Sequence, residues 1–375
     1  MLLVSEPSLD GEEMTAVVDA IASNWITMGG RVEAFERAFA EAHGVAGAAA
    51  VNSCTAGLHL ALQAFDIGPG DEVLVPSLSF VATANCVLYC NATPVFVDTE
   101  SLELPLLSCE DAAAKCTPRT RAVIVMHYAG YVVDREAWRE FADSRGLILI
   151  EDSAHAVGAE RGEIFGDAAI FSFFGNKNMT TAEGGMVVAP DPEILRRVRQ
   201  ARGHGMTSST MQRLRGGHAA AYDVTMLGNN YRMDELRAAI GLVQLKKLGG
   251  WNARRKALAL EYERNLAAMC PEVSVPFRNR RNASRPSSHH IMPVLLPVHA
   301  DRQAVIDRLR ESGVQTSFHY PPIHTLSFYR DRHPSPRLPT TEEFATRELT
   351  LPLHPKMQHS QVEYVAHALA QAIAH

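Results

Sequence analysis

Short apolar runs alternate with stretches of helical periodicity between about residues 45 and 190. The runs are rich in β-branched and aromatic residues, and several are apolar on both faces. They comprise residues 71–76, 93–98, 121–126, 147–152, 168–174 and 184–189. Apolar strands separated by helices are typical of a mostly parallel sheet that helices cover on both sides. The pattern therefore predicts an α/β fold with a large, mostly parallel mixed sheet flanked by helices.

The pattern before and after this region is helical. Two amphipathic segments near the start, DGEEMTAVVDAIAS and RVEAFERAFAEAHG, are predicted helices that a turn at Gly29 and Gly30 separates. We expect both to lie across the sheet domain or its partner. After Tyr231, helices over 232–248 and 251–269 are predicted to meet at two further glycines. They would connect the sheet domain to the C-terminal third of the chain.

The C-terminal third reads as a smaller α/β domain. A strand is predicted at 291–297, a helix near 301–312 and a final helix from about residue 359. A length of 375 residues suits two domains. We place residues 1–248 in a large domain that includes the N-terminal helices, and residues 249–375 in a small C-terminal domain.

Composition excludes several classes of function. The chain is 46% hydrophobic and 21% charged, which is ordinary for a globular protein. A net charge of −6 gives no global field for nucleic acid or an anionic membrane surface. No apolar run is long enough for a membrane-spanning helix. The six cysteines form no CxxC pair and the start shows no signal pattern, so we expect a cytoplasmic protein.

An acid and a lysine follow neighbouring strands of the predicted sheet. Asp152 ends the strand at 147–152, and Lys177 lies five residues beyond Ser172 in a polar, Gly-rich segment. Ligands bind at the carboxyl ends of parallel strands. Taken singly, Asp152 reads as a turn former and Lys177 as a surface lysine. Together they fit pyridoxal 5′-phosphate (PLP), which needs a lysine for its aldehyde and a carboxylate for its ring nitrogen.

The same edge offers groups for the rest of that cofactor. Residues 51–62 form a hydroxyl-rich turn that opens a helix, where Thr55 and Ala56 would present N–H groups to a phosphate. Ser172 would add a hydroxyl. Phe80 follows another strand, where its ring could stack on the pyridine. Helix capping by Ser53 and Thr55 and a core position for Phe80 remain alternative interpretations.

Nine segments carry a family resemblance in a fixed order. They are WITMGGRVEAFERAFA, SCTAGLHLAL, VPSLSFVATAN, EDSAHAVGA, FSFFGNKNMTTAEGGMVV, RGHGM, GNNYRMDELRAAIGLVQL, HYPPIH and LTLPLHP. The chain resembles the DegT/StrS family of PLP-dependent sugar aminotransferases over essentially its whole length. The resemblance implies the fold type I aminotransferase architecture.

The resemblance also implies roles for individual residues. Lys177 would form the Schiff base with the cofactor, Asp152 would pair with the pyridinium, and His155 would reach the phenolic oxygen. The phosphate would be bound by Thr55, Ala56 and Ser172.

Family members lend an asparagine from the neighbouring subunit to the phosphate, and Asn230 matches it. The resemblance therefore implies a homodimer with shared active sites.

Three positions depart from the family pattern. Asn229 stands where an aromatic residue is frequent, so the asparagine that reaches the phosphate is either of the two. Ala182 replaces a common glycine, so a backbone angle in that turn is expected to differ. Cys54 replaces a small residue and reads as a packed thiol.

The segment HYPPIH is a candidate substrate contact. Its prolines stiffen the backbone and would hold His319, Tyr320 and His324 as donors and acceptors. A substrate role for at least one of them and a purely structural role both stay open.

The sixteen histidines give no convincing ligand set, and we expect no metal site. The arginines of 278–285 either meet a diphosphate or belong to a solvated, mobile loop.

The function that the resemblance implies is transfer of an amino group by a ping-pong mechanism. The donor would be glutamate or glutamine. The acceptor would be a ketosugar, with FSFFGNK resembling members that aminate nucleotide-linked ketosugars for antibiotic or polysaccharide aminosugars. Three alternatives remain: a ketocyclitol aminotransferase, a PLP-dependent sugar dehydratase, against which Lys177 argues, and a non-catalytic PLP-binding regulator.

Overall fold

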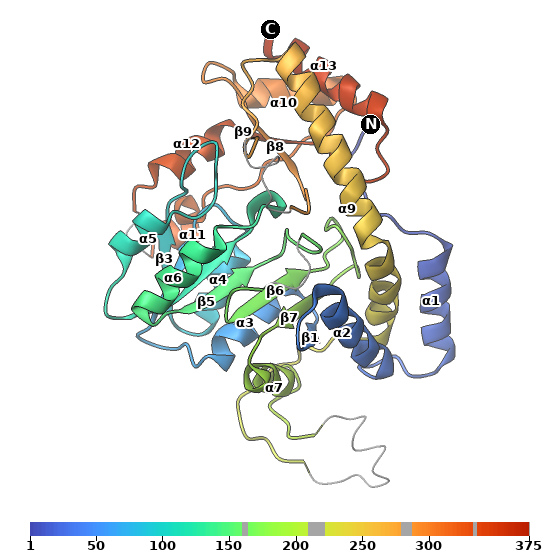
Figure 1. Cartoon of the computed structure of the whole chain (residues 1–375), viewed down its shortest axis with the longest axis vertical. Helices are drawn as coiled ribbons and strands as arrows, with labels where there is room; N and C mark the ends of the chain where they lie inside the picture. The colour runs from blue at the N-terminus through green and yellow to red at the C-terminus, as the bar shows by residue number, and fades with distance from the viewer. Residues whose placement is uncertain (160–163, 209–221, 279–286, 333–335, 375) are drawn as a thin grey trace.

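A seven-stranded sheet forms the centre of the molecule (Figure 1). The computed structural model describes residues 1–159, 164–208, 222–278, 287–332 and 336–374. The strand order is β1-β7-β6-β5-β4-β2-β3, and only β7 runs antiparallel to its neighbours in the described sheet. The strands are β1 (Ala48–Val51), β2 (Glu72–Pro76), β3 (Thr93–Val97), β4 (Thr120–Met126), β5 (Ile148–Asp152), β6 (Ala168–Ser172) and β7 (Gly185–Val188).

All six predicted apolar runs are strands of this sheet, and the predicted mostly parallel sheet is confirmed. In β4, Ala122 and Ile124 face one hydrophobic cluster while Val123 and Val125 face another. That double burial explains why the runs are apolar throughout. The sequence did not reveal β1, because its alanines carry little strand preference.

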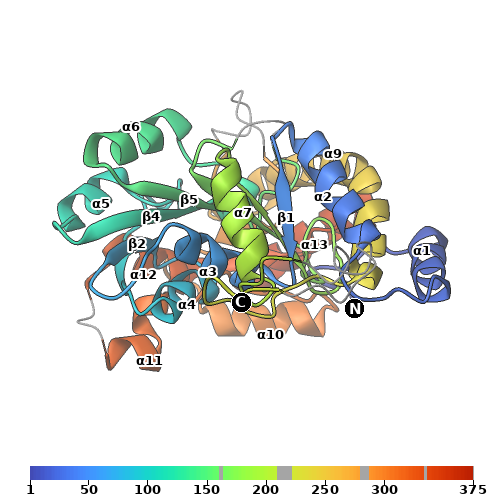
Figure 2. The ribbon, with the colours of Figure 1, turned by 90° about the horizontal axis from the view of Figure 1, so that it is seen from below.

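Helices cover both faces of the sheet (Figure 2). One face packs against α3, α4 and α7, and the other packs against α5 and α6 beside the middle strands and against α2 and α9 beside β1 and β7. The helices of this part are α3 (Cys54–Ala64), α4 (Ala82–Tyr89), α5 (Cys109–Lys115), α6 (Arg135–Arg145) and α7 (Pro192–Ala201). A short 3-10 turn, η1 (Tyr128–Gly130), follows β4.

The two predicted N-terminal helices are confirmed as α1 (Gly11–Ala22) and α2 (Gly30–His43). Both pack against α9 (Glu235–Met269), and Figure 1 shows α1 on the outer side of that helix. The buried carboxylate of Glu235 accepts the amides of Gly29, Arg31 and Val32, each at 2.9 Å. A residue more than 200 positions away thus fixes the turn before α2.

The long helix α9 contradicts one expectation. It runs for 35 residues and passes through Gly249 and Gly250, so the prediction of two helices meeting there is wrong. Each glycine costs about 1 kcal/mol in a helix. Packing of α9 against α1, α2 and α13 offsets that cost. The proposed domain boundary falls within this helix and stays a prediction.

A second, two-stranded sheet lies beyond α9, at the end of the molecule where both termini lie (Figure 1). The predicted strand and two helices are confirmed here, whereas β9 was not predicted. The elements are β8 (Met292–Leu295), α10 (Arg302–Glu311), η2 (Ile323–Thr325), α11 (Ser327–Arg330), α12 (Pro339–Arg347), β9 (Glu348–Leu351) and α13 (His359–Ala374). A separate hydrophobic cluster joins this sheet to α9 through Leu258 and Tyr262.

None of the helices in the described ranges combines the length and the apolar character needed to cross a membrane. All six cysteines are free thiols.

The turn between β6 and β7 holds Ala182 in a left-handed backbone conformation, with φ of +66°. The expectation that a backbone angle in this turn differs from that of relatives with glycine stays a prediction. The Ala182 amide donates to Thr180 Oγ1 at 2.9 Å. Left-handed backbone costs an alanine about 1–2 kcal/mol.

Ala182→Gly is therefore expected to raise the free energy of unfolding by about 0.5–1 kcal/mol, since part of the relief is offset by the entropy of the unfolded glycine. Ala16→Gly, within α1, is the matched control, and it is expected to lower the free energy of unfolding by about 1 kcal/mol. Urea unfolding of both variants measures this. Equal destabilisation by the two substitutions would contradict the strain argument.

Candidate active site

The predicted site residues gather at one edge of the sheet. Asp152 and Ser172 are the last residues of β5 and β6, which pair in parallel, and Lys177 lies in the turn after β6. β1 runs parallel to β6, because β7 is antiparallel to both, so the start of α3 faces the same edge. Parallel pairing thus brings together residues that are far apart in the chain.

Asp152 is a buried carboxylate, and two neutral donors hold it in place. Its Oδ2 accepts the Thr83 hydroxyl at 2.8 Å, and its Oδ1 accepts the Ala154 amide at 3.2 Å. Burial raises the pKa of Asp152, and these donors and the charge of Lys177 oppose the rise. A cation bound against this carboxylate would therefore be stabilised strongly.

Lys177 supplies an amine close to that carboxylate. Its amine has no hydrogen-bond partner within the described ranges. Burial lowers the pKa of Lys177 to about 8, while the charges of Cys54 and Asp152 act in the opposite direction. The amine therefore lies within electrostatic reach of both the start of α3 and the end of β5, and part of its population is neutral near pH 7.

The start of α3 is an anion site by its geometry. Ser53 caps the helix by accepting the Ala56 amide at 3.1 Å, as the capping interpretation held for this turn. The amides of Cys54 and Thr55 have no partner among the described residues. A Cβ at Gly185 would lie 2.8 Å from the Cys54 nitrogen, so this glycine lets β7 approach the helix start closely.

These residues fit PLP. Two unpaired helix amides and the nearby Ser172 suit its phosphate, and the buried Asp152 suits a protonated ring nitrogen. Ser172 is 5% exposed, and its hydroxyl accepts the Phe174 amide at 3.4 Å. Phe80 is exposed, which contradicts the core alternative for this ring and leaves its face free to stack.

A cluster of aromatic rings lies beside Lys177. His155 is buried, with Nδ1 accepting the Ala129 amide at 3.3 Å and Nε2 lying 2.8 Å from the Tyr320 hydroxyl. Its ring lies 4.2 Å from that of His290 and 6.2 Å from that of His319. Burial lowers the pKa of His155 well below its usual value, and the Lys177 charge adds to the effect. His155 therefore acts as a neutral ring.

His324 lies apart from this cluster. Its Nδ1 is 2.7 Å from Ser77 Oγ, its Nε2 is 3.3 Å from Glu342 Oε1, and its ring packs near Phe96. His319 and Tyr320 thus lie in the ring cluster beside Lys177. Both ring nitrogens of His324 instead contact Ser77 and Glu342, outside that cluster. A substrate role for His324 stays a prediction.

Three residues at the site gave no sequence signal. Thr83 bonds Asp152 across 69 positions. Asn178 donates to Asn252 Oδ1 at 2.7 Å and to the Ser288 carbonyl at 2.8 Å, so its Oδ1 is the acceptor for His290 Nδ1. His290 Nε2 is then a buried acceptor that has no hydrogen-bond partner among the described residues.

Asn230 lies beside the start of α3. Its carbonyl oxygen accepts a hydrogen bond from the Asn52 side chain at 3.4 Å, and Gly203, which lies just beyond α7, forms an antiparallel β-bridge with it. Asn230 is exposed in the single chain, while Asn229 is half-buried. Of the segment 278–285, only Arg278 lies within the described residues, and Arg280, Arg281 and Arg285 lie outside them.

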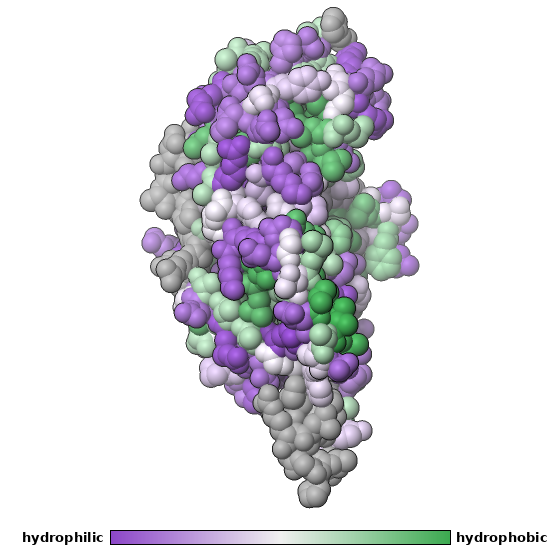
Figure 3. All heavy atoms as spheres, turned by 90° about the vertical axis from the view of Figure 1, so that its right-hand side faces the viewer, coloured by the Kyte–Doolittle hydropathy of each residue, from purple (hydrophilic) through white to green (hydrophobic). Residues whose placement is uncertain are grey.

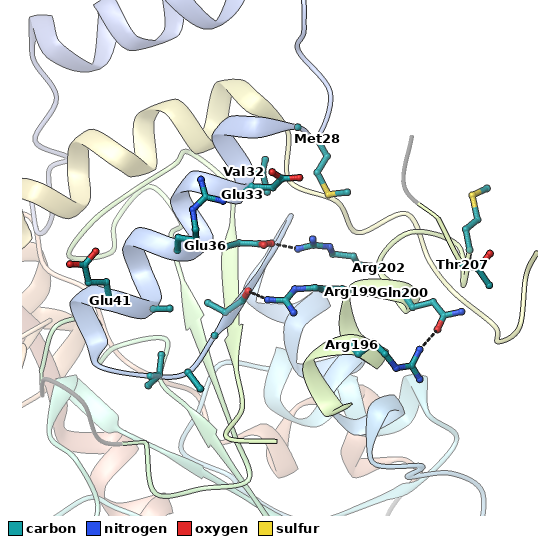
Figure 4. Close-up of a pocket in the computed structure, with 18 of the residues that line it drawn as sticks. Met28, Val32, Glu33, Glu36, Glu41, Arg196, Arg199, Gln200, Arg202 and Thr207 are labelled. Atoms are coloured by element: carbon teal, nitrogen blue, oxygen red, sulfur yellow. Dashed lines mark hydrogen bonds and ion pairs between the residues drawn. The ribbon is translucent and has the colours of Figure 1, made fainter. Parts of the chain in front are cut away.

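A large cavity elsewhere is not the candidate site. It has a volume of about 880 Å³ and lies between α2, β1 and α7 (Figure 4). Glu36 points across it toward Arg202, and Arg199 Nη2 donates to the Ala48 carbonyl at 2.8 Å. Its lining contains none of the predicted site residues.

Comparison with known proteins gives one family. The model of the DegT/DnrJ/EryC1/StrS aminotransferase family matches residues 7–370. The aminotransferase TlmJ from Streptoalloteichus hindustanus is 35% identical, with a TM-score of 0.91 over 100% of this chain and 99% of that one. DesI, solved in the presence of its TDP-sugar product, is 32% identical, with a TM-score of 0.86 over 99% and 92%.

Spr1654 from Streptococcus pneumoniae, solved in a PMP form, is 25% identical, with a TM-score of 0.92 over 100% of this chain and 99% of that one. The same protein has also been solved in a PLP form. These likenesses confirm the fold type I aminotransferase architecture and imply PLP as the cofactor.

In the cofactor-free protein, Lys177 is expected to titrate near pH 8, more than two units below an ordinary lysine at about 10.4. Asp152→Asn removes a charge that raises this pKa, so the midpoint should fall further. Brief acetylation across a pH series, with the Lys177 peptide quantified by mass spectrometry, measures the midpoint. A midpoint like that of exposed lysines, or one that Asp152→Asn leaves in place, would contradict the electrostatic account.

Proposed function

Because this chain belongs to the DegT/DnrJ/EryC1/StrS aminotransferase family, and is thus a PLP-dependent sugar aminotransferase, we propose that it moves an amino group from glutamate or glutamine to a nucleotide-linked ketosugar. The observation that carries the proposal is the position of the Lys177 amine, between a buried carboxylate and the unpaired amides of a helix start. The cytoplasm is the proposed compartment, in keeping with six free thiols.

When bound, PLP supplies an aldehyde that condenses with amines and a ring that withdraws electrons from the adjacent carbon. Lys177 would hold that aldehyde until the amino donor takes its place. The Lys177 amine would then accept a proton from the donor's α-carbon and return it. Its pKa of about 8 suits this work, because the amine both accepts and returns a proton near neutral pH.

The remaining residues would hold and orient the cofactor. Asp152 keeps the ring nitrogen protonated, and Thr83 keeps the carboxylate directed toward it. The amides of Cys54 and Thr55 and the hydroxyl of Ser172 bind the phosphate. The Ala56 amide is already bonded to Ser53, so its phosphate role requires a shared donor. His155 would contact the phenolic oxygen and Phe80 would stack on the ring.

The acceptor sugar would lie against His319 and Tyr320. Support for a nucleotide-linked substrate comes from DesI, which was solved in the presence of its TDP-sugar product and is 32% identical to this chain. The two half-reactions use one site in turn, so the kinetics are ping-pong.

We further propose a homodimer with shared active sites. On α1, Met14, Val18 and Ile21 recur at helical spacing and are 67%, 62% and 55% exposed. Figure 3 faces the side of the molecule on which α1 lies and shows hydrophobic patches among hydrophilic surface. Exposed apolar stripes mark interaction surfaces. The exposed Asn230 would reach the phosphate of the partner's site.

The first half-reaction is expected to be visible by absorbance. Glutamate or glutamine, added to protein loaded with PLP, should replace the pyridoxal band by the pyridoxamine band, and Lys177→Ala should abolish the change. Nucleotide-linked ketosugars and ketocyclitols, supplied in parallel to the pyridoxamine form, identify the acceptor. A pyridoxal band that no amino donor alters would support a non-catalytic protein, and turnover of cyclitols alone would exclude a sugar acceptor.

Heterodimers test the shared site. When Lys177→Ala and Asn230→Ala subunits are co-expressed, the mixed dimer should hold one intact site and regain about half of the wild-type activity. The same pairing with Asn229→Ala identifies which asparagine acts. Activity no higher than that of the Asn230→Ala homodimer would show that Asn230 serves its own subunit.

A further inference from the structure

A hydrogen-bonded chain leads from a buried acid to the substrate side of the site. Glu348, the first residue of β9, is 1% exposed. Its Oε2 accepts the backbone amide of His319 at 2.9 Å, and its Oε1 accepts the Thr350 hydroxyl at 2.6 Å. The Thr350 oxygen lies 2.8 Å from Nδ1 of His319. The three side chains thus form one continuous path.

The direction of these bonds fixes the state of the His319 ring. When Thr350 donates its only hydroxyl hydrogen to Glu348, its oxygen must accept from Nδ1–H of His319. Nε2 is then an unprotonated acceptor. It has no hydrogen-bond partner in the described residues, and it belongs to the ring cluster that the Lys177 charge reaches.

Protonation of Glu348 reverses both bonds of the Thr350 hydroxyl, while the bond from the His319 amide stays as it is. The acid hydrogen then points to the Thr350 oxygen, and Thr350 donates to Nδ1 of His319. Nε2 must therefore carry the ring hydrogen and becomes a donor. In atoms, one proton enters at Nε2, the Nδ1 proton passes to Thr350, and the Thr350 proton passes to Glu348. The imidazole stays neutral throughout, and the carboxylate becomes a neutral acid.

We propose that Glu348 is a positioning residue that, through Thr350, decides whether Nε2 of His319 accepts or donates a hydrogen bond toward the amino acceptor. The inference rests on the proposed function, in which His319 contacts the acceptor sugar. A ketosugar offers both hydroxyl donors and a carbonyl acceptor, and a ring whose hydrogen can change sides serves either. The same path takes up a substrate proton without forming a buried imidazolium.

The surroundings of Glu348 favour this role. Burial raises the pKa of Glu348 to about 8, so both of its states are populated near neutral pH. Burial also lowers the pKa of His319 to about 3, so His319 does not hold the proton itself. Among the described residues, the other charged or titratable groups that interact with this acid are Arg302 of α10, Tyr128 of η1 and Tyr320.

The test is the tautomer of His319, read by nitrogen-15 NMR on cofactor-free protein with labelled histidine. A His319→Gln variant assigns the signals. Wild type should carry the hydrogen on Nε2 at low pH and on Nδ1 at high pH, with a midpoint near 8. A wild-type tautomer that stays the same from about pH 6 to about pH 10 would overturn the proposal.

Glu348→Gln should hold the ring in one state. The backbone amide of His319 needs an acceptor, so the new amide places its oxygen there and its NH₂ group toward Thr350. Thr350 then donates to Nδ1, and Nε2 keeps its hydrogen at every pH. Glu343→Gln on α12 is the matched control, since it removes a 51% exposed carboxylate, and it should leave the transition in place.

Thr350 gives a second pair in case the amide variant does not fold. Thr350→Ser keeps a hydroxyl and should keep the transition, whereas Thr350→Val should abolish it. With the active protein, the variants that lose the transition should change KM for the acceptor and its pH profile and leave the donor half-reaction unchanged. A transition retained in Thr350→Val would overturn the relay. If the tautomer of His319 changes with pH but the protein transfers no amino group, the relay stands and only the proposed function is refuted.

Discussion

The parallel pairing of β4, β5 and β6, with β7 reversed beside them, is the constraint on which the site depends. It brings the carboxyl ends of three strands, the start of β7 and the start of α3 to one edge. Asp152 and Lys177 then lie in a partly dry space where each affects the pKa of the other. In water this interaction would be small, and burial strengthens it. The buried acid and the amine are the two groups that PLP chemistry requires.

The second constraint is the attachment of the C-terminal elements to that edge. The amide of Asn178 donates to Asn252 on α9 and to the carbonyl of Ser288, so the residue after Lys177 is tied to both. His319 and Tyr320 arrive from the same part of the chain and contact His155. The lysine turn is therefore held against α9 and the C-terminal part of the chain, and a substrate held there would contact both.

The sequence predicted the elements whose pattern is local. Asp152 and Lys177 could be placed because each follows an apolar run whose period identifies a strand. Contacts across long separations could not be predicted, such as the Thr83 bond to Asp152 or the Glu348 bond to the amide of His319. The continuity of α9 was missed for a related reason, because tertiary packing outweighs the local cost of two glycines. Strand β1 was missed because burial, rather than a strand preference of its alanines, holds it in the sheet.

The central claim is that Lys177 is the residue that binds the cofactor's aldehyde. Borohydride reduction of protein loaded with PLP, followed by peptide mapping with mass spectrometry, tests this claim most directly. The account predicts one pyridoxyl group, attached to Lys177 and absent from Lys177→Ala. A label on another lysine, or no label at all, would contradict it.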